Sequence, residues 1–69
     1  MQVDLVKVKS LGFGTKHCLM VNGIPVMLSG KHKAQSMLRV ALNGFSEDEP
    51  LSKSEQGYIL KAIKTLNSK

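Results

Sequence analysis

An Asn-Gly pair between two apolar runs constrains this chain more than any other feature. The pair is Asn22-Gly23, and it separates the run over residues 17–21 from the run over residues 24–28. Both central residues of a type I′ turn need positive φ, which asparagine and glycine adopt most readily. The sequence therefore predicts a β-hairpin of strands 17–22 and 24–28, closed by a two-residue turn.

The turn also predicts which residues of the hairpin face each other. The expected pairs are Val21 with Ile24, Met20 with Pro25, Leu19 with Val26, Cys18 with Met27, and His17 with Leu28. Because side chains alternate along a strand, one face is expected to carry Leu19, Val21, Ile24, Val26 and Leu28. The other face is expected to carry Cys18, Met20, Pro25 and Met27. Both faces are apolar, so we expect a partner, a second copy or the chain's own helices to cover the second one.

Pro25 indicates where a further strand belongs. Proline has no backbone N–H, so strand 24–28 is expected at an edge of the sheet. The free side of strand 17–22 then needs another partner, and residues 3–9 are rich in β-branched side chains. A glycine-rich turn over residues 11–15 connects the two segments. Apolar alternation slips between Leu5 and Val6, which is compatible with a β-bulge in this strand or with burial of both its faces.

Residues 31–42 have the periodicity of an amphipathic helix. The apolar stripe consists of Ala34, Met37, Leu38, Ala41 and Leu42. Gly44 follows the last periodic residue and suits a helix C-terminus with positive φ, and Phe45 is then expected to pack back on the helix. The acidic segment Glu47-Asp48-Glu49 is expected to be a solvated turn.

A second helix is predicted to begin after Ser52. Ser52 and Glu55 have the spacing of a capping box, in which each side chain bonds to the other residue's backbone N–H. The buried stripe is predicted to be Ile59, Ala62, Ile63 and Leu66, with Tyr58 beside it. The expected fold is a single small α+β domain over residues 1–69, with a three-stranded antiparallel β-meander followed by two α-helices. Both helices are expected on one face of the sheet.

Size and composition restrict the class of protein. A chain of 69 residues buries only about 60% of its unfolded surface and is marginally stable alone. Apolar runs fall far short of the roughly 20 residues of a membrane span, and no secretory signal pattern opens the chain. A single cysteine gives no intramolecular disulfide, so we expect a cytoplasmic protein.

Few residues of this chain are suited to metal or covalent chemistry. His17 and Cys18 are adjacent on a predicted strand, so they point to opposite faces and do not bind one ion together. A nucleophilic pair of Cys18 with His32 is left open by the sequence. The acidic residues are clustered rather than opposed. We therefore expect no enzyme activity, no metal and no cofactor.

The leading functional hypothesis is a non-enzymatic binding protein of the accessory or inhibitory type, which occludes or bridges a protein partner. It depends on the second apolar sheet face and on the methionine content, because methionine adapts to irregular partner surfaces. The contact residues are predicted to be Phe13, Met20, Pro25 and Met27. A homodimer that packs these faces together is a related hypothesis.

The alternative hypothesis is nucleic-acid binding. The chain carries a formal charge of +5, with ten basic and five acidic residues, which favours anionic partners. Phosphate contacts are predicted for Lys31, His32, Lys33, Arg39, Lys61 and Lys64, the first three lying at a helix start that favours anions. Nine of the ten basic residues of the chain are lysine, which supplies charge without the bidentate base reading of arginine.

Overall fold

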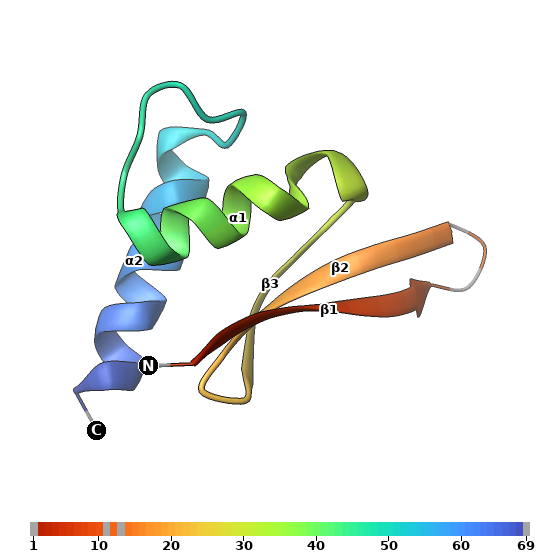
Figure 1. Ribbon diagram of the computed structural model, residues 1–69, viewed down its shortest axis with the longest axis horizontal. Helices are drawn as coiled ribbons and strands as arrows, with labels where there is room; N and C mark the ends of the chain where they lie inside the picture. Colours follow the sequence, from red (N-terminus) through yellow and green to blue (C-terminus); the bar gives the residue numbers. More distant parts are fainter. Residues whose placement is uncertain (1, 11, 13, 69) are drawn as a thin grey trace.

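The computed structural model describes residues 2–10, 12 and 14–68, and Figure 1 shows a three-stranded antiparallel sheet followed by two helices. The strands are β1 (Val3–Ser10), β2 (Gly14–Val21) and β3 (Ile24–Ser29), and the helices are α1 (Lys31–Asn43) and α2 (Lys53–Asn67). The sheet order is β1-β2-β3, with β2 in the centre. The predicted α+β meander followed by two helices is confirmed.

The turn between β2 and β3 has the predicted backbone. Asn22 has φ of 53° and Gly23 has φ of 79°, so both central residues lie in the left-handed region of a type I′ turn. The side chain of Asn22 also accepts a hydrogen bond from the backbone N–H of Gln2 at 3.0 Å, which ties the turn to the start of β1. The Asn-Gly signal thus specifies a local structure that tertiary contacts leave intact.

Two glycine substitutions are expected to change stability in opposite directions. Gly23→Ala forces an L side chain into positive φ and should lower the free energy of unfolding by about 1 kcal/mol. Gly57→Ala should raise it by about 1 kcal/mol, because Gly57 lies within α2 and a Cβ there meets open space. Thermal denaturation of both variants checks the pair, and shifts of the same sign would contradict the account.

The register of β2 and β3 departs from the predicted one after two pairs. Val21 pairs with Ile24 and Met20 with Pro25, as expected, but Leu19 pairs with Met27. The register shift between Leu19 and Met20 leaves Val26 as an extra residue, a β-bulge in β3. Beyond it, Cys18 pairs with Leu28 and His17 with Ser29. The bulge predicted as an option for β1 is absent from the described β1–β2 pairs, which run without a shift.

The bulge exchanges two side chains between the faces of the sheet. A shift of one residue moves a side chain to the opposite face. Met27 therefore shares a face with Leu19 and packs partly buried against the core. Leu28 shares the opposite face with Cys18 and is 56% exposed. The prediction that Met27 lies on the second face and Leu28 on the core face is wrong for this reason.

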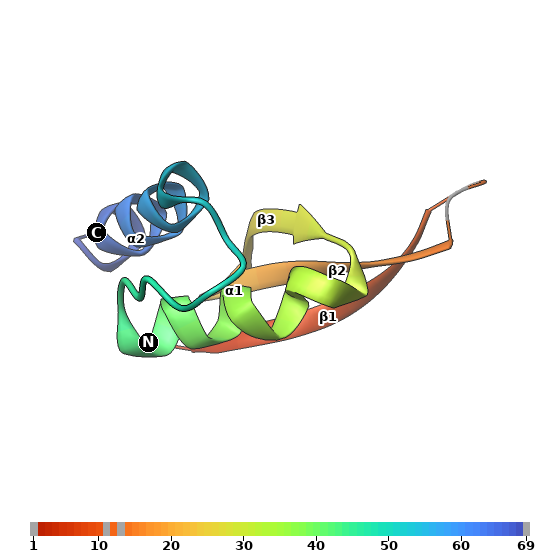
Figure 2. The ribbon, with the colours of Figure 1, turned by 90° about the horizontal axis from the view of Figure 1, so that it is seen from above.

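Helix α1 covers one face of the sheet. Figures 1 and 2 show it lying along β1 and β2. The core between helix and sheet contains Leu19 and Val21 of β2 together with Ala34, Met37, Val40 and Ala41 of α1. Leu42, which the periodicity places in this stripe, is 60% exposed, because the buried arc of the helix centres on Met37 and Val40 instead.

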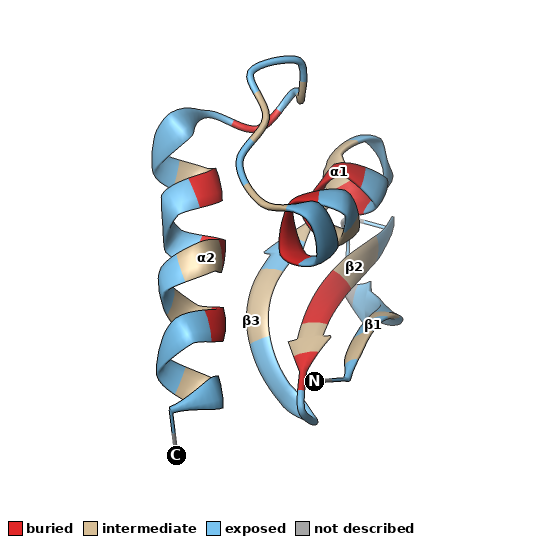
Figure 3. Cartoon of the chain, turned by 60° about the vertical axis from the view of Figure 1, so that its left-hand side comes forward, coloured by how far each residue is buried: buried red, intermediate tan, exposed pale blue. Residues whose placement is uncertain are grey.

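Helix α2 begins with the predicted capping box. The Ser52 hydroxyl accepts from the Glu55 backbone N–H at 3.2 Å, and the Glu55 carboxylate accepts from the Ser52 backbone N–H at 2.9 Å. Ile59 and Ile63 are buried, whereas Tyr58 is exposed. Figure 3 shows α2 standing beside β3 rather than across the sheet, so only α1 covers the sheet face directly.

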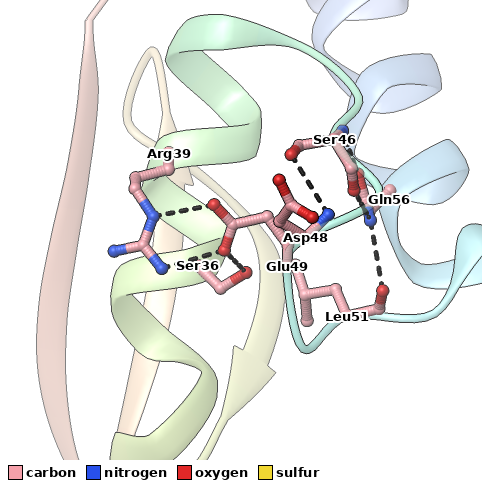
Figure 4. A network of polar contacts seen from close by, with 7 residues as sticks. All are labelled: Ser36, Arg39, Ser46, Asp48, Glu49, Leu51 and Gln56. Atoms are coloured by element: carbon pink, nitrogen blue, oxygen red, sulfur yellow. Dashed lines mark hydrogen bonds and ion pairs between the residues drawn. The ribbon is translucent and has the colours of Figure 1, made fainter.

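The connector between the helices is organised by the side chain of Gln56. This residue is 1% exposed, and its amide bonds to Ser46 in both directions, donating to the carbonyl at 2.8 Å and accepting from the N–H at 2.9 Å. It also donates to the Leu51 carbonyl at 3.1 Å (Figure 4). Gly44 has the predicted positive φ, and Phe45, which is expected to pack back on α1, is 48% exposed.

Candidate protein-interaction surface

The sheet face opposite α1 forms the candidate surface, here called the open face. Because paired residues of antiparallel strands point to the same side, the register defines its members. They are Asp4, Val6 and Val8 of β1, Lys16, Cys18 and Met20 of β2, and Pro25 and Leu28 of β3. Six of these eight side chains are apolar, so the face is a continuous apolar strip across three strands.

Exposure confirms that the open face is uncovered within the described part of the chain. Val6 is 45% exposed, Val8 40% and Leu28 56%. Pairing brings Val6 and Leu28 to either side of Cys18, which they shield to 8% exposure. The buried, apolar counterpart of this strip is on the other face, where Leu19 and Val21 pack under α1. Helix α1 therefore covers one sheet face, and no described part of the chain covers the other.

Sulfur atoms occupy the centre of the open face. The Sγ of Cys18 lies 3.6 Å from the Sδ of Met20, and its thiol also approaches the Leu19 carbonyl at 3.7 Å. Met20 is half-buried. Thioether and thiol groups are polarisable and adapt to irregular neighbours, so this centre suits contact with another protein.

The predicted contact residues fall in different places. Met20 and Pro25 lie on the open face, as the sequence indicates. Met27 lies on the helix-covered face, for the reason given above, and Phe13 lies outside the described residues. Sequence reasoning missed Val6, Val8 and Leu28. Side-chain alternation along β1 could have identified the two valines, once the pairing of β1 with β2 was known. The position of Leu28 on the open face depends on the bulge in β3.

The cations predicted to contact phosphates are spread over the molecule. Lys33 bonds to the Glu55 carboxylate at 3.3 Å, and Arg39 bonds to Glu49 at 2.8 Å. Lys31 and His32 are exposed at the start of α1, whereas Lys61 and Lys64 lie in the C-terminal half of α2, away from that end in Figure 1. The fold thus places two of the six cations in ion pairs and divides the other four between two sites.

Glu49 is a polar anchor rather than a solvated residue of the connector. Its carboxylate accepts from the Arg39 guanidinium through Nε and Nη2, both at 2.8 Å, and from the Ser36 hydroxyl at 2.6 Å (Figure 4). The hydrogen bonds from Arg39 and then Ser36 lower the pKa of Glu49 to about 2. The bidentate contact joins the connector to α1, which the acidic composition of residues 47–49 does not indicate.

Acid titration is expected to remove the stabilisation that Glu49 provides. Because its folded pKa is about 2, below the ordinary 4.5, this stabilisation is complete above pH 4.5 and is lost as pH falls toward 2. Glu49→Gln should therefore have a lower free energy of unfolding than the wild type at pH 7. Its free energy of unfolding should also fall less steeply between about pH 4.5 and 2. The exposed Glu47→Gln is the matched control. Equal acid curves for wild type and Glu49→Gln would contradict this role.

The side chains of Cys18 and the two histidines lie in different parts of the fold. The register places His17 and Cys18 on opposite faces, as predicted. His32 is exposed at the start of α1, the helix that packs on the sheet face opposite Cys18. Among the described residues, no group of three or more His, Cys, Asp or Glu side chains could hold a metal ion. The His17 Nδ1 is buried without a hydrogen-bond partner, on the α1 side.

A groove lies between β3 and α2. Its volume is about 350 Å³, and Ile24, Pro25 and Val26 line one side. Tyr58, Lys61, Ala62, Thr65 and Leu66 line the other. Pro25 belongs both to this groove and to the open face, so the two surfaces are continuous at the turn end of β3.

Comparison with known proteins adds no functional information. No protein-family model matches the chain, and no curated protein or solved structure gives a match either. Neither helix described by the structure is long and apolar enough to cross a membrane.

Proposed function

We propose that this chain is a non-enzymatic binding protein that attaches to a protein partner through the open face. The supporting observation is the exposure of Val6, Val8 and Leu28 on a sheet face whose opposite side already packs against α1. A sheet in water usually has one apolar and one polar face. An apolar strip on the second face is typical of a surface that another molecule covers.

The chemistry of the open face favours a protein over a nucleic acid. Its only described charges are Asp4 and Lys16, of opposite sign, so it offers no net attraction for phosphates. Apolar contacts of this kind stabilise protein interfaces by about 25 cal/mol per Å² of buried apolar surface before association costs are counted. We propose an accessory or inhibitory role, in which the chain acts by covering part of its partner.

Selection from a random peptide library tests the proposal, because such a library samples many binding sequences at once. The immobilised wild-type protein is compared with a threonine variant, Val6→Thr, Val8→Thr and Leu28→Thr, which keeps β-branched side chains on β1 but makes the open face polar. We expect peptides to be enriched on the wild type and to lose binding on the threonine variant. Failure to enrich any peptide, or equal binding to both proteins, would count against the proposed function.

Salt dependence separates this proposal from phosphate binding. Association through the open face should change little between low and moderate salt. Nucleic-acid binding would weaken steeply, with a log–log slope of about −0.9 per phosphate neutralised. Titration of a short generic duplex at two salt concentrations, followed by sedimentation, is the measurement. Tight, salt-sensitive binding of the duplex would favour the alternative function.

A further inference from the structure

The two edges of the sheet differ in how they are protected. At one edge, β3 is short, contains Pro25 and a bulge, and has α2 standing beside it (Figure 3). At the other edge, β1 runs for eight residues with a regular register and no described strand on its outer side. Natural sheets protect their edges with prolines, bulges, covering elements and charged side chains. Of these, the described β1 has only charged side chains, which are Asp4, Lys7 and Lys9.

The backbone groups that β1 offers at this edge follow from the pairing with β2. The Gln2 carbonyl accepts from the Asn22 N–H at 2.8 Å, so even-numbered residues of β1 direct their N–H and C=O groups at β2. The odd-numbered residues direct theirs away from the sheet. These are Val3, Leu5, Lys7 and Lys9, which together present four donors and four acceptors in a row.

Charge and apolar character alternate along the same edge. Lys7 and Lys9 are exposed on the α1 side of the sheet, whereas Val6 and Val8 are exposed on the open face. A strand paired with β1 would place alternate residues against the lysines and the valines. Acidic residues suit the positions that lie against the lysines, and apolar residues suit the positions that lie against the valines. A second copy of this chain suits the edge poorly, because each copy carries a formal charge of +5 and lysines of its own on β1.

We propose that an extended segment of the partner, in which acidic residues alternate with apolar ones, adds to the sheet along the free edge of β1. Main-chain hydrogen bonds to the odd-numbered residues hold the segment, and its side chains provide specificity. Its apolar residues extend the open face by one strand. The inference rests on the proposed function and names the chemistry of the partner at the same surface.

A synthetic octapeptide in which glutamate alternates with valine is the probe, and an octapeptide of lysine and valine is its control. Fluorescence anisotropy measures binding of each to the wild type and to a Lys7→Glu, Lys9→Glu variant. We expect the glutamate peptide to bind the wild type. Its affinity for the variant should be lower by about tenfold or by a larger factor. Preference for the lysine peptide, or no binding of either peptide to the wild type, would overturn the inference.

A proline substitution tests the backbone contact separately from charge. Lys7→Pro removes an N–H that points away from β2, so the β1–β2 hydrogen bonds remain. Lys7→Ala removes the same charge but keeps the N–H. We expect Lys7→Pro to bind the glutamate peptide more weakly than Lys7→Ala does. In the wild type, the peptide should slow amide exchange at Leu5, Lys7 and Lys9, and unchanged exchange at these amides would refute strand addition whether or not the proline variant folds.

The failures of the two proposals are distinguishable. If library peptides bind the wild type but not the threonine variant, and Lys7→Pro binds them as Lys7→Ala does, the open face is the site and strand addition is wrong. If the threonine variant binds library peptides as the wild type does, the proposed function itself is wrong.

Discussion

Replacing Gln56 by leucine is expected to lower the free energy of unfolding by about 3 kcal/mol, although the two side chains have similar volumes. Gln56 is 1% exposed and bonds to three backbone groups, the N–H and carbonyl of Ser46 and the carbonyl of Leu51. Leucine satisfies none of them. The Leu51 carbonyl bond is buried and the two Ser46 bonds are partly buried, and each group left without a partner costs about 1 kcal/mol. The connector also loses its attachment to α2.

The exposed Gln35→Leu is the matched control for this substitution. It makes the same chemical change on α1 without breaking a described hydrogen bond, so its stability should stay within about 0.5 kcal/mol of the wild type. Thermal denaturation followed by circular dichroism measures both. For a domain of this size, 3 kcal/mol corresponds to a fall in Tm of more than about 10 °C. A Gln56→Leu variant as stable as Gln35→Leu would show that the connector is held by other contacts.

The second large effect concerns binding rather than stability. The threonine variant of the open face is expected to bind a peptide selected on the wild type about 100-fold more weakly. The variant replaces three apolar side chains, which a ligand would bury, with threonines that carry a hydroxyl. A loss of about 1 kcal/mol of binding free energy for each side chain accounts for the lower affinity. The residues are exposed in the free protein, so Tm should change by only a few degrees.

A control variant removes exposed apolar side chains elsewhere. Leu42→Gln and Tyr58→Gln change α1 and α2 at positions that are 60% and 57% exposed and do not belong to the open face. This variant should bind the selected peptide within about twofold of the wild type, since surface substitutions away from a contact cost little. An equal loss of affinity in the control and in the threonine variant would indicate non-specific hydrophobic binding.

Local signals in the sequence predict local structure well. The Asn22-Gly23 turn and the Ser52–Glu55 capping box each depend on hydrogen bonds and dihedrals within a few residues, and both occur as expected. Periodicity likewise locates the first helix within one residue of its observed ends. These features need no information about the rest of the fold, which is why the order of strands and helices could be predicted.

Features that depend on distant segments could not be predicted in the same way. The bulge at Val26 leaves no clear mark in the sequence, yet it exchanges Met27 and Leu28 between the faces. The burial of Gln56 depends on how the connector places Ser46 and Leu51 beside it. The pairing of Arg39 with Glu49 joins α1 to a connector that has no periodicity of its own. For the candidate surface, the sequence predicts a second apolar face, but three of its exposed residues become evident only from the three-strand register.

Mapping a bound ligand by NMR tests the central claim most directly. Methyl chemical shifts of the protein are recorded during titration with a peptide selected on the wild type. We predict that the methyl groups of Val6, Val8, Met20 and Leu28 shift, while those of Met37 and Ile59 in the core and Leu66 in the groove do not. Shifts confined to the groove between β3 and α2, or to the start of α1, would show that the open face is not the binding surface.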